Sequence, residues 1–339
     1  MTSTDSTIPA DTASSTTNKT RILVTGATGF IGLVYCQHLI DKNVQVRVLL
    51  RDGSKAASLP ANLNAQEIIG DLSDSELMRS ACQGIDTVVH LAGIAHVAGI
   101  SEKQLWETNT AGTRNLLDAA IDAKVRRLVF VSSSLAQAAE PGGVDATSYG
   151  KSKWAAEKEL HQAQDKGQIE TVILRPVNVY GAGMKGNISG MISMLDSGRL
   201  PPLPALTSRI SLVSADDMAQ ALRLATNVEQ AVGKTYAITD GEMYVITDIE
   251  KAIYQTLGKR LPSWRTPHMI LYAASLVAGL MSPFHKIARK GGGITGRTYR
   301  NLVSDNLFSN AEISAELGFK PTTTLYRDLP EIVRVITRR

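Results

Sequence analysis

The 339-residue chain has little of several residue types that mark particular classes of protein. It contains two cysteines, Cys36 and Cys82, which are too few for a disulfide framework or a zinc site. Aromatic residues make up only 5%, and the net charge of +4 comes without a run of five or more basic residues, so a nucleic-acid-binding arm is not expected. These absences exclude disulfide-rich, collagen-like and fully disordered proteins, while 43% hydrophobic residues predict a packed core.

Long hydrophobic runs are also missing. The longest apolar stretch, Met269–Met281, is interrupted by Ser275 and Gly279 and falls short of the roughly 20 residues that span a bilayer. We therefore expect no integral membrane span; this stretch is read as a buried or partner-facing helix, with peripheral membrane contact as the alternative. Residues 1–20 hold eleven Ser or Thr, no Arg and no apolar run. This composition predicts a disordered tail and not a targeting signal. We therefore expect a cytoplasmic protein.

Short apolar runs alternate with helical patterns along the first half of the chain. The predicted strands are Arg21–Thr25, Gln45–Leu50, Ile68–Gly70, Thr87–Leu91, Arg127–Ser132 and Thr171–Leu174. The predicted helices are Phe30–Asp41, Glu76–Cys82, Glu102–Ala123 and Tyr149–Gln164. This alternation predicts an α/β protein with a Rossmann-type, doubly wound parallel sheet.

After Gly181 the alternation becomes irregular, and Pro201, Pro202 and Pro204 interrupt the chain. We expect residues 21–180 to form a dinucleotide-binding core, with return segments at about 210–240. Residues 181–339 are expected to form mainly a smaller substrate-binding region.

A glycine-rich turn follows the first predicted strand and begins the first helix. Gly26 permits a tight turn, Gly29 lets the backbone approach a pyrophosphate, and Gly32 lets helix and strand pack closely. The helix N-terminus then faces the phosphates. This strand–turn–helix context predicts a dinucleotide cofactor.

The end of the second strand selects between NAD and NADP. An acidic residue there binds ribose hydroxyls, whereas an arginine accepts a 2′-phosphate. Leu50 occupies the selector position and is followed by Arg51 and Asp52. Arg51 favours NADP, and Asp52 as the selector is the alternative. Asp71 follows the third strand, where a carboxylate can bond the adenine amino group.

Tyr149 and Lys153 lie four residues apart at the start of a predicted helix, which puts both on one face. A nearby ammonium and a cationic nicotinamide would lower the tyrosine pKa, which is near 10 in solution, and so favour proton transfer. Ser132, Ser133 and Ser134 end the fifth strand, at the sheet edge that binds ligands. One of these serines is expected to bond the reacting oxygen. No metal is expected.

Seven segments in order resemble the extended short-chain dehydrogenase/reductase superfamily, in its nucleotide-sugar epimerase/dehydratase branch, over about residues 21–330. They are Thr25-Gly-Ala-Thr-Gly-Phe-Ile-Gly32, Gly70-Asp-Leu72, His90-Leu-Ala-Gly93, Asn109-Thr-Ala-Gly-Thr113 with Asn115-Leu-Leu-Asp-Ala-Ala120, Arg127-Leu-Val-Phe-Val-Ser-Ser133, Tyr149-Gly-Lys-Ser-Lys153 and Arg175-Pro-Val-Asn-Val-Tyr-Gly181.

The resemblance implies a role for individual residues. Ser133 would be the catalytic serine, with Ser134 as the fallback, and Asn178, Asn187 and Arg209 would bind the sugar and its diphosphate. The residues implied to line the cofactor are Phe30, Ile31, Asp71, Leu72, Leu91, Ala92, Gly93, Asn109 and Val177.

The chain departs from the family pattern in two places. The segment after the serines reads Ala136-Gln-Ala138 in place of the usual Val-Tyr-Gly, and Ala95 stands where many sugar epimerases have lysine. His96 is adjacent to Ala95 and is either its replacement or a structural histidine. The hydride-transfer residues are unaffected, so these departures concern the sugar and the reaction outcome.

The resemblance implies 4-epimerisation of a UDP-linked hexose through a 4-keto intermediate. The alternative is an NADPH-dependent reductase of nucleotide-linked 4-keto sugars. A hydroxysteroid or dihydroflavonol-type dehydrogenase and a non-catalytic dinucleotide-binding regulator are the less favoured hypotheses. Family members also imply a homodimer through the helices Glu102–Ala123 and Tyr149–Gln164.

Overall fold

The computed structural model describes residues 19–40, 42–95, 100–270, 272 and 302–338. His96, most of the Met269–Met281 stretch and nearly all of the tail predicted for residues 1–20 lie outside the described residues.

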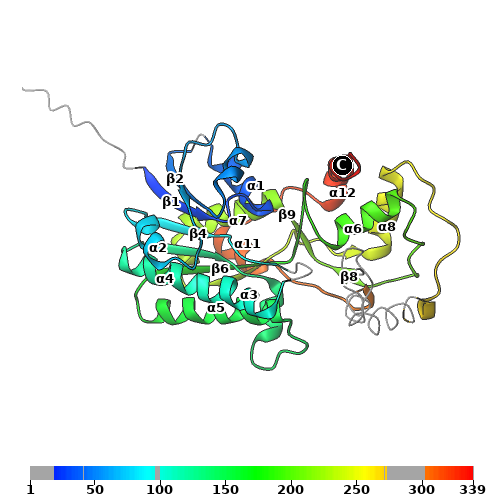
Figure 1. The fold of residues 1–339 in the computed structure, drawn as a ribbon. Helices are drawn as coiled ribbons and strands as arrows, with labels where there is room; N and C mark the ends of the chain where they lie inside the picture. The colour runs from blue at the N-terminus through cyan, green and yellow to red at the C-terminus, as the bar shows by residue number, and fades with distance from the viewer. Residues whose placement is uncertain (1–18, 41, 96–99, 271, 273–301, 339) are drawn as a thin grey trace, which may run out of the picture.

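A seven-stranded sheet forms the centre of the molecule (Figure 1). Its strands are β1 (Thr20–Thr25), β2 (Val44–Leu50), β3 (Ala65–Ile69), β4 (Thr87–His90), β5 (Arg127–Val131), β6 (Glu170–Pro176) and β10 (Thr235–Ile238). They are ordered β10-β6-β5-β4-β1-β2-β3, and every neighbouring pair is parallel. The order reverses between β1 and β4, which is the doubly wound arrangement, so the predicted fold class is confirmed.

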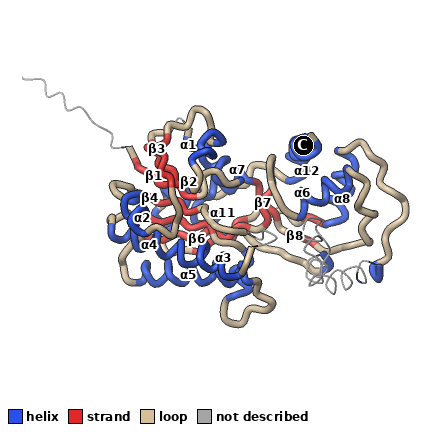
Figure 2. Tube along the Cα trace, viewed as in Figure 1, coloured by secondary structure: helices blue, strands red, loops and turns tan. Residues whose placement is uncertain are grey.

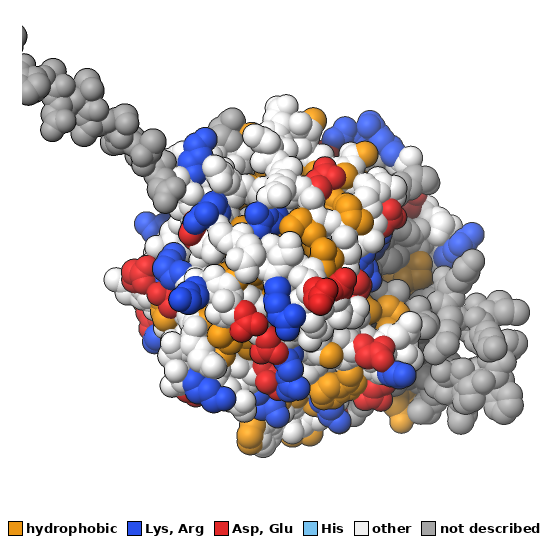
Figure 3. All heavy atoms as spheres, turned by 60° about the vertical axis from the view of Figure 1, so that its left-hand side comes forward, with side chains coloured by type: hydrophobic (Ala, Val, Ile, Leu, Met, Phe, Trp, Pro, Cys, Tyr) orange, Lys and Arg blue, Asp and Glu red, His pale blue; other side chains and the backbone are white. Residues whose placement is uncertain are grey.

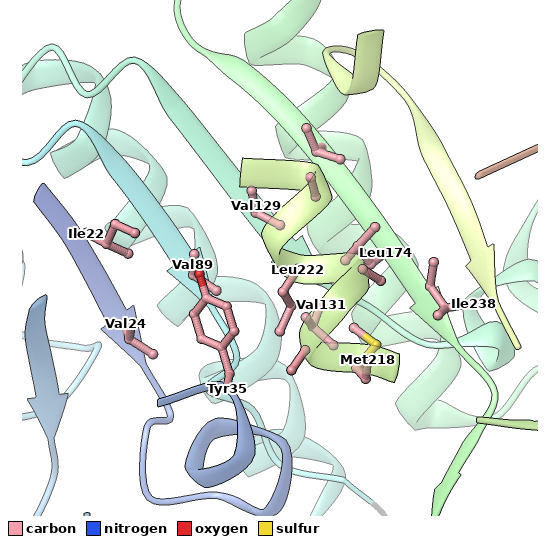
Figure 4. Packing of buried hydrophobic residues seen from close by; sticks show 14 of the residues in the cluster. Ile22, Val24, Tyr35, Val89, Val129, Val131, Leu174, Met218, Leu222 and Ile238 are labelled. Carbon is pink, nitrogen blue, oxygen red and sulfur yellow. The ribbon is translucent and has the colours of Figure 1, made fainter. Parts of the chain in front are cut away.

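Helices cover both faces of this sheet. One face carries α1 (Phe30–Leu39), α7 (Ala215–Asn227) and α11 (Ala311–Leu317), and the other carries α2 (Ser75–Cys82), α4 (Gly112–Asp122) and α5 (Ser148–Asp165). Figure 4 shows Tyr35 of α1 and Leu222 of α7 among the valines and isoleucines of the strands. Each such buried aliphatic side chain contributes about 1.5–3 kcal/mol, so the two faces hold the sheet rigid beneath its carboxyl edge.

The prediction of a single helix over Glu102–Ala123 is wrong in one respect, because a π-helical turn interrupts it. The segment consists of α3 (Glu102–Trp106), a π-helical turn, η2 (Glu107–Ala111), and α4. The buried Asn109 lies in the π turn, and its side chain bonds the backbone of Ile94 in another part of the chain. The spacing of hydrophobic residues does not predict a hydrogen bond between distant parts of the chain, so the sequence did not indicate the π turn. Such turns occur frequently at functional sites.

A second layer of structure extends from the carboxyl edge of the sheet (Figure 2). It contains β7 (Asn178–Tyr180), α6 (Asn187–Asp196), β8 (Arg209–Ile210), β9 (Leu212–Ser214), β11 (Tyr244–Val245), α8 (Ile246–Thr256) and α12 (Leu325–Thr337). We call this layer the cap; its helices share one apolar cluster around Ile192, Ile253 and Leu329. Three short 3-10 helices, η1 (Gly53–Ser58), η3 (Ser134–Ala139) and η4 (Glu229–Ala231), lie in connecting segments.

The cap and the core are interwoven along the chain. After the cap strand β9, α7 and β10 return to the core, and after α8 the chain again reaches the sheet face at α11, where Ile313 and Leu317 are buried. The sequence pattern did not predict the return at α11. In the described part of the chain, no helix is both long and apolar enough to cross a membrane.

Arg127 ties β5 to its neighbours at the end of the sheet opposite the cap. Its side chain is fully buried, bonds the carboxylates of Glu170 and Glu229, and donates to the carbonyls of Ala225, Thr226 and Val228 at the end of α7. A guanidinium at a helix C-terminus also matches the helix dipole.

We predict that Arg127→Met lowers the free energy of unfolding by about 2–4 kcal/mol, because three buried carbonyls lose a charged donor. Chemical denaturation measures the change. Arg126→Met is the matched control, because the half-exposed Arg126 contacts the same two carboxylates and its loss should leave the midpoint nearly unchanged. Equal losses in the two variants would contradict the anchoring role.

Candidate active site

The glycine turn lies at the carboxyl end of β1 and is too crowded for side chains. Gly26 has a φ of +72°, and a Cβ on it would lie 2.6 Å from the backbone nitrogen of Ala92. A Cβ on Gly32 would lie 2.2 Å from the Gly26 carbonyl oxygen. The N-cap of α1 is Gly29, whose lack of a side chain leaves the first N–H groups of the helix uncapped, and its first turn has no acidic residue. This turn therefore fits a dinucleotide pyrophosphate, as predicted from the sequence.

The loop that follows β4 forms the wall beside this turn. Leu91 and Ala92 contact Gly26, and Gly93 approaches Lys153 so closely that a Cβ on Gly93 would lie 3.1 Å from the lysine Nζ. Asn109 holds the loop from behind: its amide accepts a hydrogen bond from Ile94 N–H (2.7 Å) and donates to Ile94 C=O (2.9 Å). Asn109 is almost fully buried, so it acts on the cofactor region through this loop.

Lys153 is buried beneath the loop. Its ammonium donates to the carbonyl of Val131 (2.9 Å) and lies 4.6 Å from the centre of the Phe130 ring. Burial lowers the pKa of Lys153 to about 8, and the carboxylate of Glu157, one helical turn further on, opposes this shift. The pKa of this lysine is therefore close to the physiological range.

Tyr149 and Ser133 meet at the same edge of the sheet. Burial raises the pKa of Tyr149 to about 12, and a hydrogen bond with the Ser133 side chain opposes the rise. We expected Lys153 to favour the phenolate; in this structure the desolvation of Tyr149 dominates, and the ammonium bonds Val131 instead. Without cofactor, Tyr149 is therefore a protonated phenol that contacts Ser133, the serine that the family resemblance implies.

The residues predicted to hold the adenosine half follow β2 and β3. Arg51 is exposed at the end of β2 and pairs with no described residue, whereas Asp52 accepts a hydrogen bond from Ser54 N–H and begins η1. Asp71 is exposed after β3, with its carboxylate bonded to Ser73, and Leu72 is buried beside α4. Arg51 is thus an exposed cation at the end of β2.

Of three further residues predicted to line the cofactor, Phe30 contacts the cap, and Ile31 and Val177 belong to the core. Phe30, the first residue of α1, packs on the cap cluster and on Gly181, whose Cβ would lie 3.2 Å from the Phe30 ring. Ile31 is half-buried against the sheet core. Val177 is buried at the end of β6, where its N–H bonds Ile238.

The residues predicted for the sugar diphosphate lie in the cap. Asn178 is exposed at the start of β7, and Asn187 is exposed as the first residue of α6. Arg209 on β8 is engaged by Asp305, which accepts from its Nε (3.1 Å) and Nη2 (2.6 Å). A diphosphate would have to compete with this carboxylate.

Sequence reasoning missed the polar network under the site. His90 at the end of β4 bonds Thr25 through Nδ1 (2.6 Å) and Thr113 through Nε2 (2.9 Å), and Thr113 donates to the carbonyl of Asn109 (2.7 Å). Burial lowers the pKa of His90 to about 3, so the ring is neutral. The sequence motif contains His90, but its hydrogen-bond partners come from two other elements, β1 and α4.

The face of the molecule on the left of Figure 1 carries interspersed positive and negative side chains (Figure 3). A cavity of about 470 Å³ lies at the amino-terminal ends of β1 and β2, away from the catalytic residues. Its Arg47 donates to the carbonyls of Ala81 and Gln83 at the end of α2, and its Arg21 bonds Asp86. These arginines serve the fold. Among the described residues, no cluster of His, Cys, Asp or Glu is arranged to hold a metal ion.

The sheet, the glycine turn and the Ser133–Tyr149–Lys153 arrangement define a nicotinamide-dependent enzyme of the Rossmann type. The model of the NAD-dependent epimerase/dehydratase family matches residues 22–239. The chain belongs to this family, and it is an NAD(P)-dependent epimerase or oxidoreductase of the extended short-chain dehydrogenase/reductase type.

Its relatives include enzymes with different reactions. It is 29% identical over 262 residues to UDP-glucose 4-epimerase of Vibrio cholerae, covering 73% of this chain and 78% of the relative. It is 25% identical to 3-beta-hydroxysteroid dehydrogenase of Mycolicibacterium neoaurum, covering 94% and 91%. The crystal structure of UDP-glucuronic acid 4-epimerase from Bacillus cereus in complex with NAD has the same fold, with a TM-score of 0.74 at 21% identity, covering 94% and 99%.

The buried ammonium predicts a pH-dependent stability effect. Below pH 8 Lys153 is charged in both the folded and unfolded states, and its desolvation opposes folding. This cost disappears as the pH rises from about 8, the folded pKa, to 10.5, the ordinary value. Lys153→Met should therefore raise the melting temperature of the cofactor-free protein by a few degrees at pH 7, with a smaller gain at pH 10.

Thermal melts across this pH range measure the gain. Lys151→Met is the matched control, because Lys151 is exposed on the same helix turn, and other titrating groups act equally in all three proteins. A melting temperature that falls by the same amount at every pH would contradict a desolvated ammonium.

Proposed function

We propose that the protein is a nucleotide-sugar 4-epimerase, which oxidises C4 of a UDP-linked hexose and reduces the 4-keto intermediate on its other face. The observation that carries the proposal is the contact between the hydroxyls of Tyr149 and Ser133, at the carboxyl edge of β5, with Lys153 buried in the adjoining wall. This arrangement suits the movement of a proton to and from a secondary hydroxyl.

Each side chain has a separate task in this reaction. Ser133 bonds the reacting oxygen and orients it toward Tyr149. Tyr149 takes the hydroxyl proton during oxidation and returns it during reduction, while Lys153 contributes positive charge to the site. The nicotinamide, when bound through the Gly26–Gly32 turn, supplies reversible hydride acceptance and, in its oxidised form, a positive charge that favours the phenolate.

Similarity to the Vibrio cholerae epimerase supports the sugar substrate, and the shared fold with the Bacillus cereus epimerase is consistent with it. We assign Asn178, Asn187 and Arg209 to the sugar diphosphate, with Arg209 leaving Asp305 when the diphosphate binds. We further propose that the protein is cytoplasmic. We also propose that it forms a homodimer through the α3–α4 and α5 segments.

An NADPH-dependent reductase of nucleotide-linked 4-keto sugars is the second candidate, and two observations favour it. The pKa of Tyr149, about 12, makes this phenol a proton donor to a keto oxygen. Arg51 pairs with none of the described residues and directly follows β2, the position at which an arginine accepts a 2′-phosphate, which favours NADP.

We predict that the purified protein converts UDP-glucose or its N-acetylated analogue into the 4-epimer without added NADPH. Tyr149→Phe should lower kcat by at least about 100-fold, because the proton-transfer group is lost. Nucleotide-sugar chromatography follows the product. Turnover only of a keto-sugar, with one NADPH consumed per product, would replace the epimerase by the reductase.

The pair between Arg209 and Asp305 predicts a gain in diphosphate affinity. Asp305→Asn should lower the Kd for UDP by up to about fivefold, because the guanidinium is released and a negative charge is removed. Isothermal titration calorimetry measures this Kd. Asp196→Asn, which removes an exposed cap carboxylate paired with Lys259, should leave it unchanged. A higher Kd in Asp305→Asn would mean that Asp305 holds Arg209 in its binding position.

A further inference from the structure

A buried charge cluster lies beside the catalytic residues and is not used by the proposed chemistry. Arg175 of β6 donates from Nε to Glu157 Oε1 (3.0 Å), and its Nη2 lies 2.5 Å from both Glu157 Oε2 and Glu140 Oε1. The Glu157 side chain is completely buried, and Arg175 is 12% exposed. The guanidinium also stacks near the Trp154 ring, 5.6 Å from its centre.

The two carboxylates belong to the two segments that carry the reacting hydroxyls. Glu157 lies on α5, two turns after Tyr149 and one turn after Lys153. Glu140 directly follows η3, the short helix whose N-cap is Ser133. Arg175 therefore bridges the Ser133 segment to the Tyr149 helix from the strand that lies beside both.

The backbones of η3 and α5 pack closely, but few side chains are buried between them. A Cβ on Gly150, in the first turn of α5, would lie 2.2 Å from the carbonyl oxygen of Leu135 in η3. η3 itself consists of Ser134-Leu-Ala-Gln-Ala-Ala139 and buries only Ser134 and Ala136. So small an apolar contact contributes little to holding η3 in place, which makes the charged contact at its end important.

We propose that Arg175 is a positioning residue, which fixes the separation of Ser133 and Tyr149 by holding Glu140 and Glu157 with one planar guanidinium. Arginine suits this task because its fork binds two carboxylates in fixed directions, whereas lysine offers a single point of charge. The consequence for catalysis rests on the proposed function; the consequence for the placement of η3 does not.

Glu140 is the residue at which to test the bridge. Its side chain is 34% exposed on a loop, so Glu140→Gln removes one arm while the buried Arg175–Glu157 pair stays intact and the protein stays folded. We expect faster hydrogen exchange in the peptide that spans residues 133–143, with the 149–165 helix unchanged. With the enzyme's own substrate, kcat should fall about tenfold while KM changes less than twofold, because loss of alignment is felt mainly in the reacting complex.

Arg175→Lys and the double variant complete a mutant cycle. If Glu140 acts through Arg175, the double variant should have the same kcat as Arg175→Lys alone, whereas independent sites would multiply their effects. Glu159→Gln is the matched control, because Glu159 lies on the same helix but pairs with Arg114 on the other side. It should change neither exchange nor kcat.

Unchanged exchange in residues 133–143 of Glu140→Gln would overturn the bridge, whatever the substrate proves to be. Multiplicative effects in the cycle, or a kcat of Glu140→Gln within twofold of wild type, would overturn the positioning role. A wild-type protein that is inactive on UDP-hexoses, combined with faster exchange in the variant, would instead count against the proposed sugar and support the bridge.

Discussion

The burial of one ammonium group organises the catalytic edge of this protein. Lys153 must lie deep in the wall to reach the site, and desolvation there lowers its pKa toward neutrality. Three interactions stabilise the buried ammonium: a hydrogen bond to the carbonyl of Val131, a contact with the face of the Phe130 ring and the negative charge of Glu157. Gly93 lies beside the ammonium, and a Cβ at this position would make a tight contact of 3.1 Å with the lysine Nζ.

The loop after β4 links the buried ammonium to the glycine turn. The loop after β4 has to accommodate Lys153 on one side and Gly26 on the other, so its backbone is held by Asn109 from a π-helical turn. His90, kept neutral by burial, links that turn to β1 through Thr25 and Thr113. Hydrogen bonds thus connect β1, β4, the π-helical turn and the loop after β4.

The cap differs from the core in how it is attached and in the exposure of its polar residues. It attaches at the carboxyl edge of the sheet through Phe30 and the Tyr180 hydroxyl, which donates to the buried Asp240. Its polar residues Asn178, Asn187 and Arg209 are exposed. The relatives of this chain include a UDP-glucose 4-epimerase and a 3-beta-hydroxysteroid dehydrogenase, so proteins similar to it act on different substrates.

The sequence alone determined the core, because its strands, its glycine turn and the Tyr149–Lys153 spacing are local patterns with fixed periods. The alternation that predicts parallel strands also places their carboxyl ends, and hence Ser133, at one edge. Only the tertiary structure decided which partners these residues have. The π turn at Asn109, the return of α11 to the sheet, the pairing of Arg209 with Asp305 and the bridge at Arg175 join residues far apart in the chain. The raised pKa of Tyr149 is likewise a consequence of desolvation, which depends on the packing of the whole fold and not on neighbours in sequence.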